Sequence, residues 1–202
     1  MLMVSDAFRF ILPVFVLCIL AALFGLPYVA LLFFVVAVCI GLFFRNPRRA
    51  IPDGARWIVS PADGRVIQIS RPPDGDQTIS IFMSVFNVHV NRSPIRGQLE
   101  SLEYRRGRFK PAYAAEAPRV NEQNTLTIAG EGMKVVVRQI AGLIARRVVC
   151  WKKPGDSLQR GERIGLIRFG SRVDVVLPRE VNITVHVGDR VRGGSSILGE
   201  HA

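Results

Sequence analysis

The sequence is poor in the residues that build metal sites and disulfide frameworks. It has three cysteines and three histidines among 202 residues. Cys18 and Cys39 lie in a long apolar run and Cys150 in a strand-like apolar segment, so all three are expected to be small buried hydrophobic residues. No Cys/His cluster has metal-ligand spacing, and neither a Walker loop nor a dinucleotide-binding glycine pattern occurs. The sequence therefore predicts no metal ion.

Charge is absent from Ile11 to Phe44. Two apolar arms, Ile11–Phe24 and Tyr28–Phe44, flank the turn signal Gly25-Leu26-Pro27, which predicts an N-terminal helical hairpin at the membrane. Each arm is shorter than the roughly 20 residues of a full crossing. A shallow hairpin, two tilted spans and one long span therefore stay open.

Most of the basic residues follow the apolar run and give a formal net charge of +11. The cluster Arg45, Arg48 and Arg49 comes directly after it, and the positive-inside rule predicts that the rest of the chain faces the cytoplasm of a cell membrane. An anionic membrane surface is the expected partner of this charge. Nucleic acid is not, because no basic run with interleaved aromatic residues occurs. We divide the chain into a membrane-associated hairpin at 1–45 and a β-rich domain at 46–202.

Short apolar runs separated by turn signals fill the chain after Trp57, and no sustained helical period appears. The predicted fold class is therefore mostly β, with an all-β domain after the hairpin. Barrel-sandwich-like elements are expected in this domain, because two G-D-x-[LV] segments begin at Gly155 and Gly188, as in such folds. The expected strands are Arg65–Ile69, Thr78–Met83, Gly97–Tyr104, Asn124–Ile128, Lys134–Ile140, Ala145–Trp151, two pieces within Gly161–Pro178, and Asn182–Val187.

The segment Gly161–Pro178 contains two apolar strand pieces separated by Phe169-Gly170-Ser171-Arg172. A glycine inside a strand pattern often marks a bulge, and a neighbouring serine often caps a turn. Alternatively, the pair is a self-processing peptide bond, since Gly170 has no Cβ to hinder attack on its carbonyl and Ser171 supplies a hydroxyl. The local pattern alone leaves both interpretations open.

Two further residues are candidates for catalysis. His89 lies where an apolar strand gives way to a polar turn, a place from which a rigid element can aim a side chain at a cleft. Asp63 lies in Ser60-Pro61-Ala62-Asp63-Gly64, where an aspartate commonly bonds its own backbone. A structural role is the alternative for both residues. His186 and His201 are expected to be structural or solvent-facing.

Three motifs together resemble the phosphatidylserine decarboxylase proenzyme family, in its short bacterial and archaeal form. They are Gly161–Pro178, Ser60–Gly64 and Phe82–Pro94, and the resemblance runs from about Asn46 to about Gly199. It implies self-cleavage at Gly170–Ser171 into chains 1–170 and 171–202, which stay together as a heterodimer. It also implies that Ser171 becomes a pyruvoyl group, the covalent cofactor, which forms a Schiff base with phosphatidylserine and yields phosphatidylethanolamine in phospholipid biosynthesis.

The resemblance also suggests residue roles. His89 matches the family's active-site histidine, and Asp63 matches the aspartate that orients it toward the serine. Longer members have two histidines three residues apart, and Phe86 takes the earlier place here, so Asn91 or Arg92 is a candidate to share the work. The head group could be held by Arg92, Arg168 or Arg172. Further homo-oligomerisation is left open.

Three alternatives compete with this interpretation. A second glycine-serine step at Gly193-Gly194-Ser195-Ser196 is a competing cleavage site, but a cut there would leave only an eight-residue fragment starting at Ser195, so Gly170–Ser171 is preferred and a last hairpin turn is an adequate explanation. A membrane-anchored carrier or adaptor would need a lysine at a hairpin tip, whereas Met133-Lys134 enters a valine-rich strand. A basic nucleic-acid binder would leave the apolar run unexplained.

Overall fold

The computed structural model describes residues 3–54, 56–143, 147–168 and 170–201. By its internal contacts the chain divides into two units, Met1–Arg48 and Arg49–Ala202. The predicted strand Ala145–Trp151 begins outside the described residues. Phe169 of the glycine-serine step also lies outside them.

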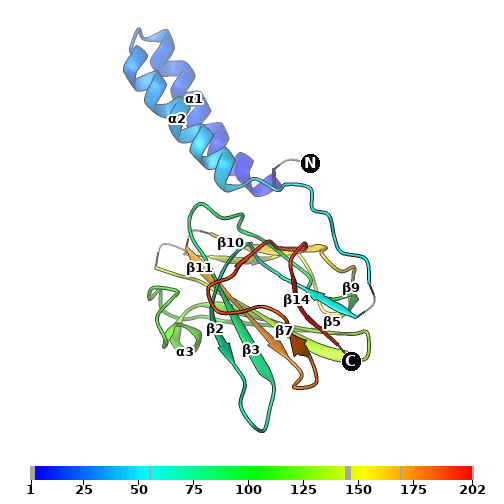
Figure 1. Ribbon diagram of the computed structural model, residues 1–202. Helices are drawn as coiled ribbons and strands as arrows, with labels where there is room; N and C mark the ends of the chain where they lie inside the picture. Colours follow the sequence, from blue (N-terminus) through cyan, green and yellow to red (C-terminus); the bar gives the residue numbers. More distant parts are fainter. Residues whose placement is uncertain (1–2, 55, 144–146, 169, 202) are drawn as a thin grey trace. The chain divides into compact units, whose positions relative to one another are not determined.

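The first unit is a pair of apolar helices, α1 (Phe8–Leu23) and α2 (Pro27–Phe43), preceded by a short 3-10 helix η1 (Ser5–Ala7). Pro27 begins α2, where its missing N–H costs no helical hydrogen bond. The two helices run side by side (Figure 1), and the Cys18 Sγ donates to the Ala30 carbonyl at 3.3 Å. The predicted hairpin is therefore confirmed, and one continuous long helix is excluded.

Only part of this hairpin has the length of a membrane span. Among the described residues, the helical stretch Ser5–Leu23 is long and apolar enough to cross a bilayer, whereas α2 is shorter. Most of the large apolar side chains of both helices are exposed. An apolar solvent such as a bilayer would bury this surface.

The described residues of the second unit form mostly β-strands, as predicted, joined by turns and by the short helix α3 (Ala117–Val120). The strands are β1 (Trp57–Val59), β2 (Gly64–Ser70), β3 (Gln77–Met83), β4 (Val90–Arg92), β5 (Gly97–Arg105), β6 (Gln123–Gly130), β7 (Met133–Ile140), β8 (Val148–Cys150), β9 (Ser157–Leu158), β10 (Arg163–Ile167), β11 (Ser171–Leu177), β12 (Asn182–Ile183), β13 (Arg190–Val191) and β14 (Ile197–Glu200).

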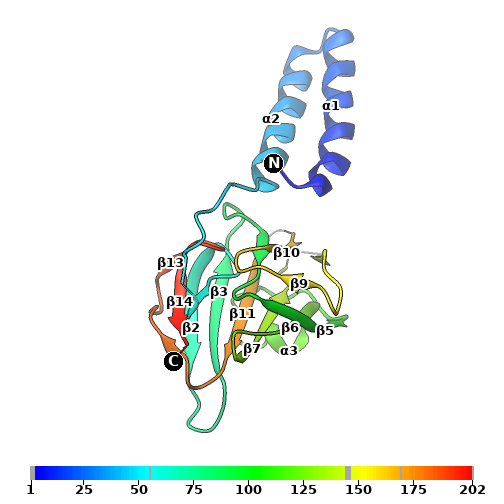
Figure 2. The same ribbon diagram turned by 90° about the vertical axis from the view of Figure 1, so that its right-hand side faces the viewer.

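The described strands form one large sheet and two small ones. The large sheet has the order β13-β2-β3-β11-β7-β6-β5-β9, and the small sheets have the orders β4-β10-β8 and β1-β14-β12. Neighbouring strands are antiparallel, and Figure 2 shows the large sheet curving around the interior. The strand β11 lies near its middle, between β3 and β7.

Alternation along the central strands explains the core. Val173, Val175 and Leu177 of β11 and Ile79 and Ile81 of β3 face the interior and are fully buried. The residues between them point to the other face of the sheet, as the two-residue period of a strand requires. Ser171 begins this inward-facing series, so its side chain enters the core.

The predicted strand Asn182–Val187 is wrong in length, because β12 ends at Ile183. The chain then turns, and the Asp189 carboxylate accepts a hydrogen bond from the His186 backbone N–H at 2.8 Å. Aspartate side chains commonly stabilise turns in this way. His186 is exposed, as expected.

Candidate active site

Ser171 is the first residue of β11 and is completely buried. It pairs with Met83 at the end of β3, and its Oγ donates to the Met83 Sδ at 3.4 Å. A thioether is a weak acceptor. In the uncut chain the serine hydroxyl is therefore held in the core by a partner from which it is easily released.

Gly170 presents its carbonyl to a cramped backbone environment. It has a φ of +53°, a conformation that glycine adopts without steric cost. A Cβ added to Gly142 would overlap the Gly170 carbonyl oxygen and lie 3.0 Å from its carbon. The carbonyl that self-cleavage would attack is thus packed against the backbone of a second glycine.

His89 lies between β3 and β4 and is 2% exposed. Its Nδ1 is 2.9 Å from the Asn87 carbonyl oxygen. Because a carbonyl only accepts, Nδ1 of a neutral His89 carries the proton and Nε2 is the basic nitrogen. This tautomer suits a general base.

Strand pairing brings His89 and Ser171 into the same region. The segment with His89 connects β3 to β4, and the segment with Gly170 connects β10 to β11. Since β3 pairs with β11 and β4 pairs with β10, the two connections lie next to each other. The Ile167 N–H also donates to the His89 carbonyl at 3.3 Å. Within the described residues, however, the Ser171 hydroxyl is bonded to Met83 and not to His89.

Asp63 is hydrogen-bonded to residues other than His89, the partner that the resemblance suggested. Its carboxylate accepts from Arg49 Nη2 at 2.9 and 2.7 Å and from the Gly193 N–H at 2.7 Å. None of these three bonds involves His89, so in the part of the chain that is described Asp63 and His89 are not directly joined. The orienting role of Asp63 remains a prediction.

Arg92 shows the electrostatic character of this region. Burial lowers its pKa first, and the nearby charges of Arg49 and Arg163 lower it further, whereas Asp63 opposes the shift. Arg92 Nη1 donates to the Gly161 carbonyl at 2.9 Å. The Asp63 carboxylate thus lies among several cations.

The second glycine-serine step is a turn. The Gly194 N–H donates to the Ser60 carbonyl, and the N–H groups of Ser195 and Ser196 both donate to the Arg192 carbonyl. This turn leads into β14. The turn interpretation of Gly193–Ser196 is therefore confirmed.

Other candidates also have internal partners. Arg172 donates to Asp174 at 2.6 Å and to the Ser80 hydroxyl at 2.7 Å, and all three are buried. Lys134 lies in β7 and pairs with Glu100 at 2.8 Å. Burial raises the pKa of the Cys150 thiol, which keeps it neutral.

Sequence reasoning missed a buried chain of amides beside Ser171. Gln139 Nε2 donates to Asn91 Oδ1 at 2.8 Å, and Asn124 Nδ2 donates to Gln139 Oε1 at 3.3 Å. Asn91 Nδ2 also contacts the Met83 sulfur at 3.8 Å, the atom that holds Ser171. The sequence offered one indication of this chain: Gln139 is a polar residue at an inward position of a strand whose other inward residues are Met133, Val135 and Val137.

Comparisons with known proteins identify the family to which the chain is similar. A family model described as phosphatidylserine decarboxylase matches residues 36–199. A phosphatidylserine decarboxylase proenzyme of Solibacter usitatus is 46% identical over 198 residues, which cover 98% of this chain and 96% of that protein. The proenzyme of Carboxydothermus hydrogenoformans is 41% identical over 206 residues, covering 98% and 96%. That of Desulfotalea psychrophila is 47% identical over 165 residues, covering 78% and 77%.

A buried serine that opens a central strand, together with these matches, defines the class as a decarboxylase made as a proenzyme. The chain belongs to the phosphatidylserine decarboxylase family. Members of this family are carboxy-lyases of phospholipid biosynthesis that use a pyruvoyl group derived from a serine of the chain, as the resemblance implied.

Proposed function

We propose that this chain cuts itself between Gly170 and Ser171 and then decarboxylates phosphatidylserine to phosphatidylethanolamine. The position of Ser171 supports the choice of this peptide bond. Ser171 is completely buried at the start of the central strand and follows a glycine with a φ of +53°. The proenzyme names of the relatives support processing of the chain.

In the proposed cleavage, His89 Nε2 takes the proton of the Ser171 hydroxyl, and Oγ attacks the Gly170 carbonyl carbon. The peptide nitrogen leaves, and an ester joins the two residues. Loss of the Ser171 Cα proton then breaks the Cβ–Oγ bond, which releases Gly170 as a carboxylate. Water converts the remaining dehydroalanine to a pyruvoyl group and ammonia. A pyruvoyl group supplies an electron sink for decarboxylation.

The other residues have supporting roles in this proposal. His89 is the general base of cleavage and returns a proton to the substrate carbon after carbon dioxide leaves. Asp63, through its contacts with Arg49 and Gly193, fixes the loop before β2 and orients the histidine only after local rearrangement. The cut enzyme is a pair of chains, 1–170 and 171–202.

The proposed location is the cytoplasmic face of the cell membrane. The apolar stretch Ser5–Leu23 supplies the anchor, and the arginines that follow α2, Arg45 and Arg48, favour the cytoplasmic side. A tethered domain meets a lipid substrate without leaving the surface.

A denaturing mass spectrum tests the proposal. Wild type should give fragments 1–170 and 171–202, with the short fragment blocked at its N-terminus, and Ser171→Ala should stay intact. Ser195→Ala is the matched control and should be cut as wild type. A cut before Ser195, or cleavage of the Ser171→Ala chain, would refute the assignment.

A further inference from the structure

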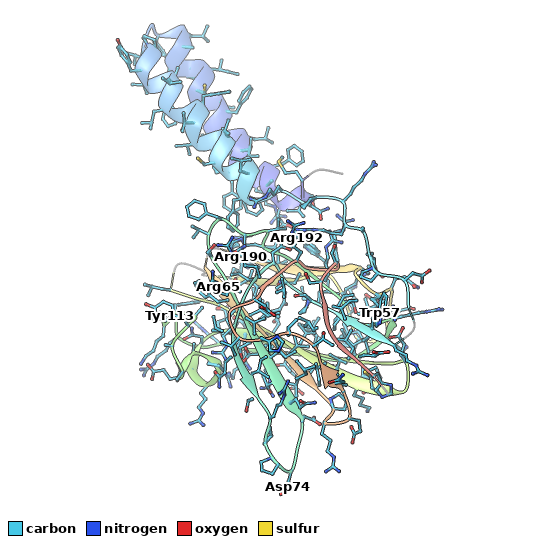
Figure 3. All side chains as sticks on the ribbon, viewed as in Figure 1. Trp57, Arg65, Asp74, Tyr113, Arg190 and Arg192 are labelled. Atoms are coloured by element: carbon cyan, nitrogen blue, oxygen red, sulfur yellow. The ribbon has the colours of Figure 1, made fainter. Side chains whose placement is uncertain are left out.

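The β domain contains a cavity of about 1040 Å³ whose lining includes three arginines. Arg65 lies on β2, Arg190 on β13, and Arg192 directly after β13. Figure 3 shows the three side chains together at one end of the domain, opposite the β2–β3 hairpin tip that carries Asp74. We call this cavity the arginine pocket.

The positive charge of the pocket is not balanced by the protein. Arg65 and Arg190 are direct partners in the β2–β13 pair, where like charges are destabilising. Within the described residues, no ion pair or side-chain hydrogen bond involves the guanidinium groups of Arg65, Arg190 or Arg192. The one carboxylate in the lining, Asp63, is already bonded to Arg49 and Gly193. An anionic ligand would relieve this repulsion.

An apolar loop borders the same pocket. Phe86 lines it and is 83% exposed, and the adjacent Val85 is 41% exposed. Exposed aromatic residues beside cationic groups suit the boundary between lipid head groups and acyl chains. A free inorganic anion would use the arginines but would leave Phe86 and Val85 without a role.

We propose that the arginine pocket binds the phosphate group of a membrane glycerophospholipid. Guanidinium groups bind phosphate oxygens through paired, charge-assisted hydrogen bonds, and the exposed Phe86 and Val85 beside them suit the apolar part of a lipid. The pocket adjoins the proposed catalytic centre, because Asn87 lines it and accepts a hydrogen bond from the His89 ring. The choice of lipid as ligand rests on the proposed function.

Binding is measured on the full chain carrying Ser171→Ala, dissolved in neutral detergent micelles, by isothermal titration calorimetry. The probes are dihexanoyl phosphatidylserine, dihexanoyl phosphatidylglycerol, the phosphate-free dihexanoylglycerol and inorganic phosphate. We expect both phospholipids to bind more tightly than either of the other two probes. Equal binding of dihexanoylglycerol, or binding of inorganic phosphate as tight as that of the phospholipids, would overturn the proposal.

Arginine variants assign the binding to the pocket. Arg65→Gln and Arg190→Gln should each weaken phospholipid binding about tenfold or more, because each removes a charged hydrogen-bond donor to phosphate. Arg71→Gln is the matched control, since Arg71 is also exposed but directly follows the end of β2 that lies away from Arg65. Unchanged binding by both pocket variants, or an equal loss in Arg71→Gln, would place the lipid elsewhere.

This test is independent of cleavage. The Ser171→Ala chain forms no pyruvoyl group, so its binding does not depend on the proposed reaction. Phospholipid binding by a protein whose wild type is never cut would refute the proposed cleavage and leave the arginine pocket supported. Normal cleavage without phospholipid binding would refute the pocket alone.

Discussion

Gly142 contacts the peptide bond that we expect to be cut, and one methyl group there should interfere with the reaction. An added Cβ would overlap the Gly170 carbonyl oxygen, so Gly142→Ala must displace that carbonyl. A misplacement of about 1 Å in a reacting group can slow a reaction about 100-fold. We therefore expect cleavage of Gly142→Ala to be slower by about that factor, measured as the appearance of fragment 171–202 over time.

Gly155→Ala is the matched control for this substitution. Gly155 has a φ of +95° and no atom within 4 Å of an added Cβ, so alanine strains a remote turn without touching the site. The Gly155→Ala substitution should lower the free energy of unfolding by about 1–3 kcal/mol. Cleavage of Gly142→Ala at the wild-type rate would show that the carbonyl position is not critical.

The individual site residues differ in how far the sequence could predict them. The Gly170–Ser171 step was visible as a local pattern, because a glycine and a hydroxyl in adjacent positions are sufficient to suggest it. The partners of Asp63 were not visible, since Arg49 and Gly193 lie 14 and 130 positions away along the chain. Contacts over such separations follow from the fold.

At the scale of elements, the buried amide chain joins three strands, because Asn91 lies on β4, Asn124 on β6 and Gln139 on β7. Replacing Gln139 by leucine would leave the Asn91 oxygen and the Asn124 amide without their present partner. A buried polar group left unsatisfied costs about 1–3 kcal/mol. We expect Gln139→Leu, in the Ser171→Ala background, to lower the free energy of unfolding by about this amount, measured by urea titration in detergent.

Gln98→Leu is the corresponding control on β5. Gln98 is exposed and donates to the Gly155 carbonyl at 3.1 Å, so its loss should change the free energy of unfolding by less than about 0.5 kcal/mol. If Gln139→Leu unfolds at the same urea concentration as its parent, the amide chain does not stabilise the fold.

Long strands were predictable with nearly their full bounds, whereas the bounds and pairing of the short strands were not. The strands β3, β5, β6 and β7 each carry enough inward-facing apolar residues to reveal a two-residue period. The strands β9, β12 and β13 have two residues each, which is too short for any period. These short strands form where a neighbouring strand edge offers hydrogen bonds. The two G-D-x-[LV] segments did indicate β9 and β13, but nothing in the sequence indicated that β13 pairs with β2 and so provides a wall of the arginine pocket.

At the scale of the whole molecule, the proposed cut divides one folded domain into two interlocked chains. The fragment 171–202 contains β11, β12, β13 and β14. Its first strand is hydrogen-bonded to β3 on one side and β7 on the other, while β13 pairs with β2 and β14 with β1. Every one of these outside partners belongs to the fragment 1–170.

The short fragment should therefore remain bound after cleavage. It contributes Val173, Val175, Leu177 and Leu198 to the core with no exposed surface, and each such side chain stabilises the assembly by about 1.5–3 kcal/mol. We expect both fragments to co-elute from a size-exclusion column in mild detergent, at the volume of the intact Ser171→Ala chain, and to separate only in guanidinium chloride. Loss of the short fragment on the native column would contradict this expectation. Retention would keep the new N-terminus of β11 between β3 and β7, so the reactive group would form in a site that the uncut chain had already folded.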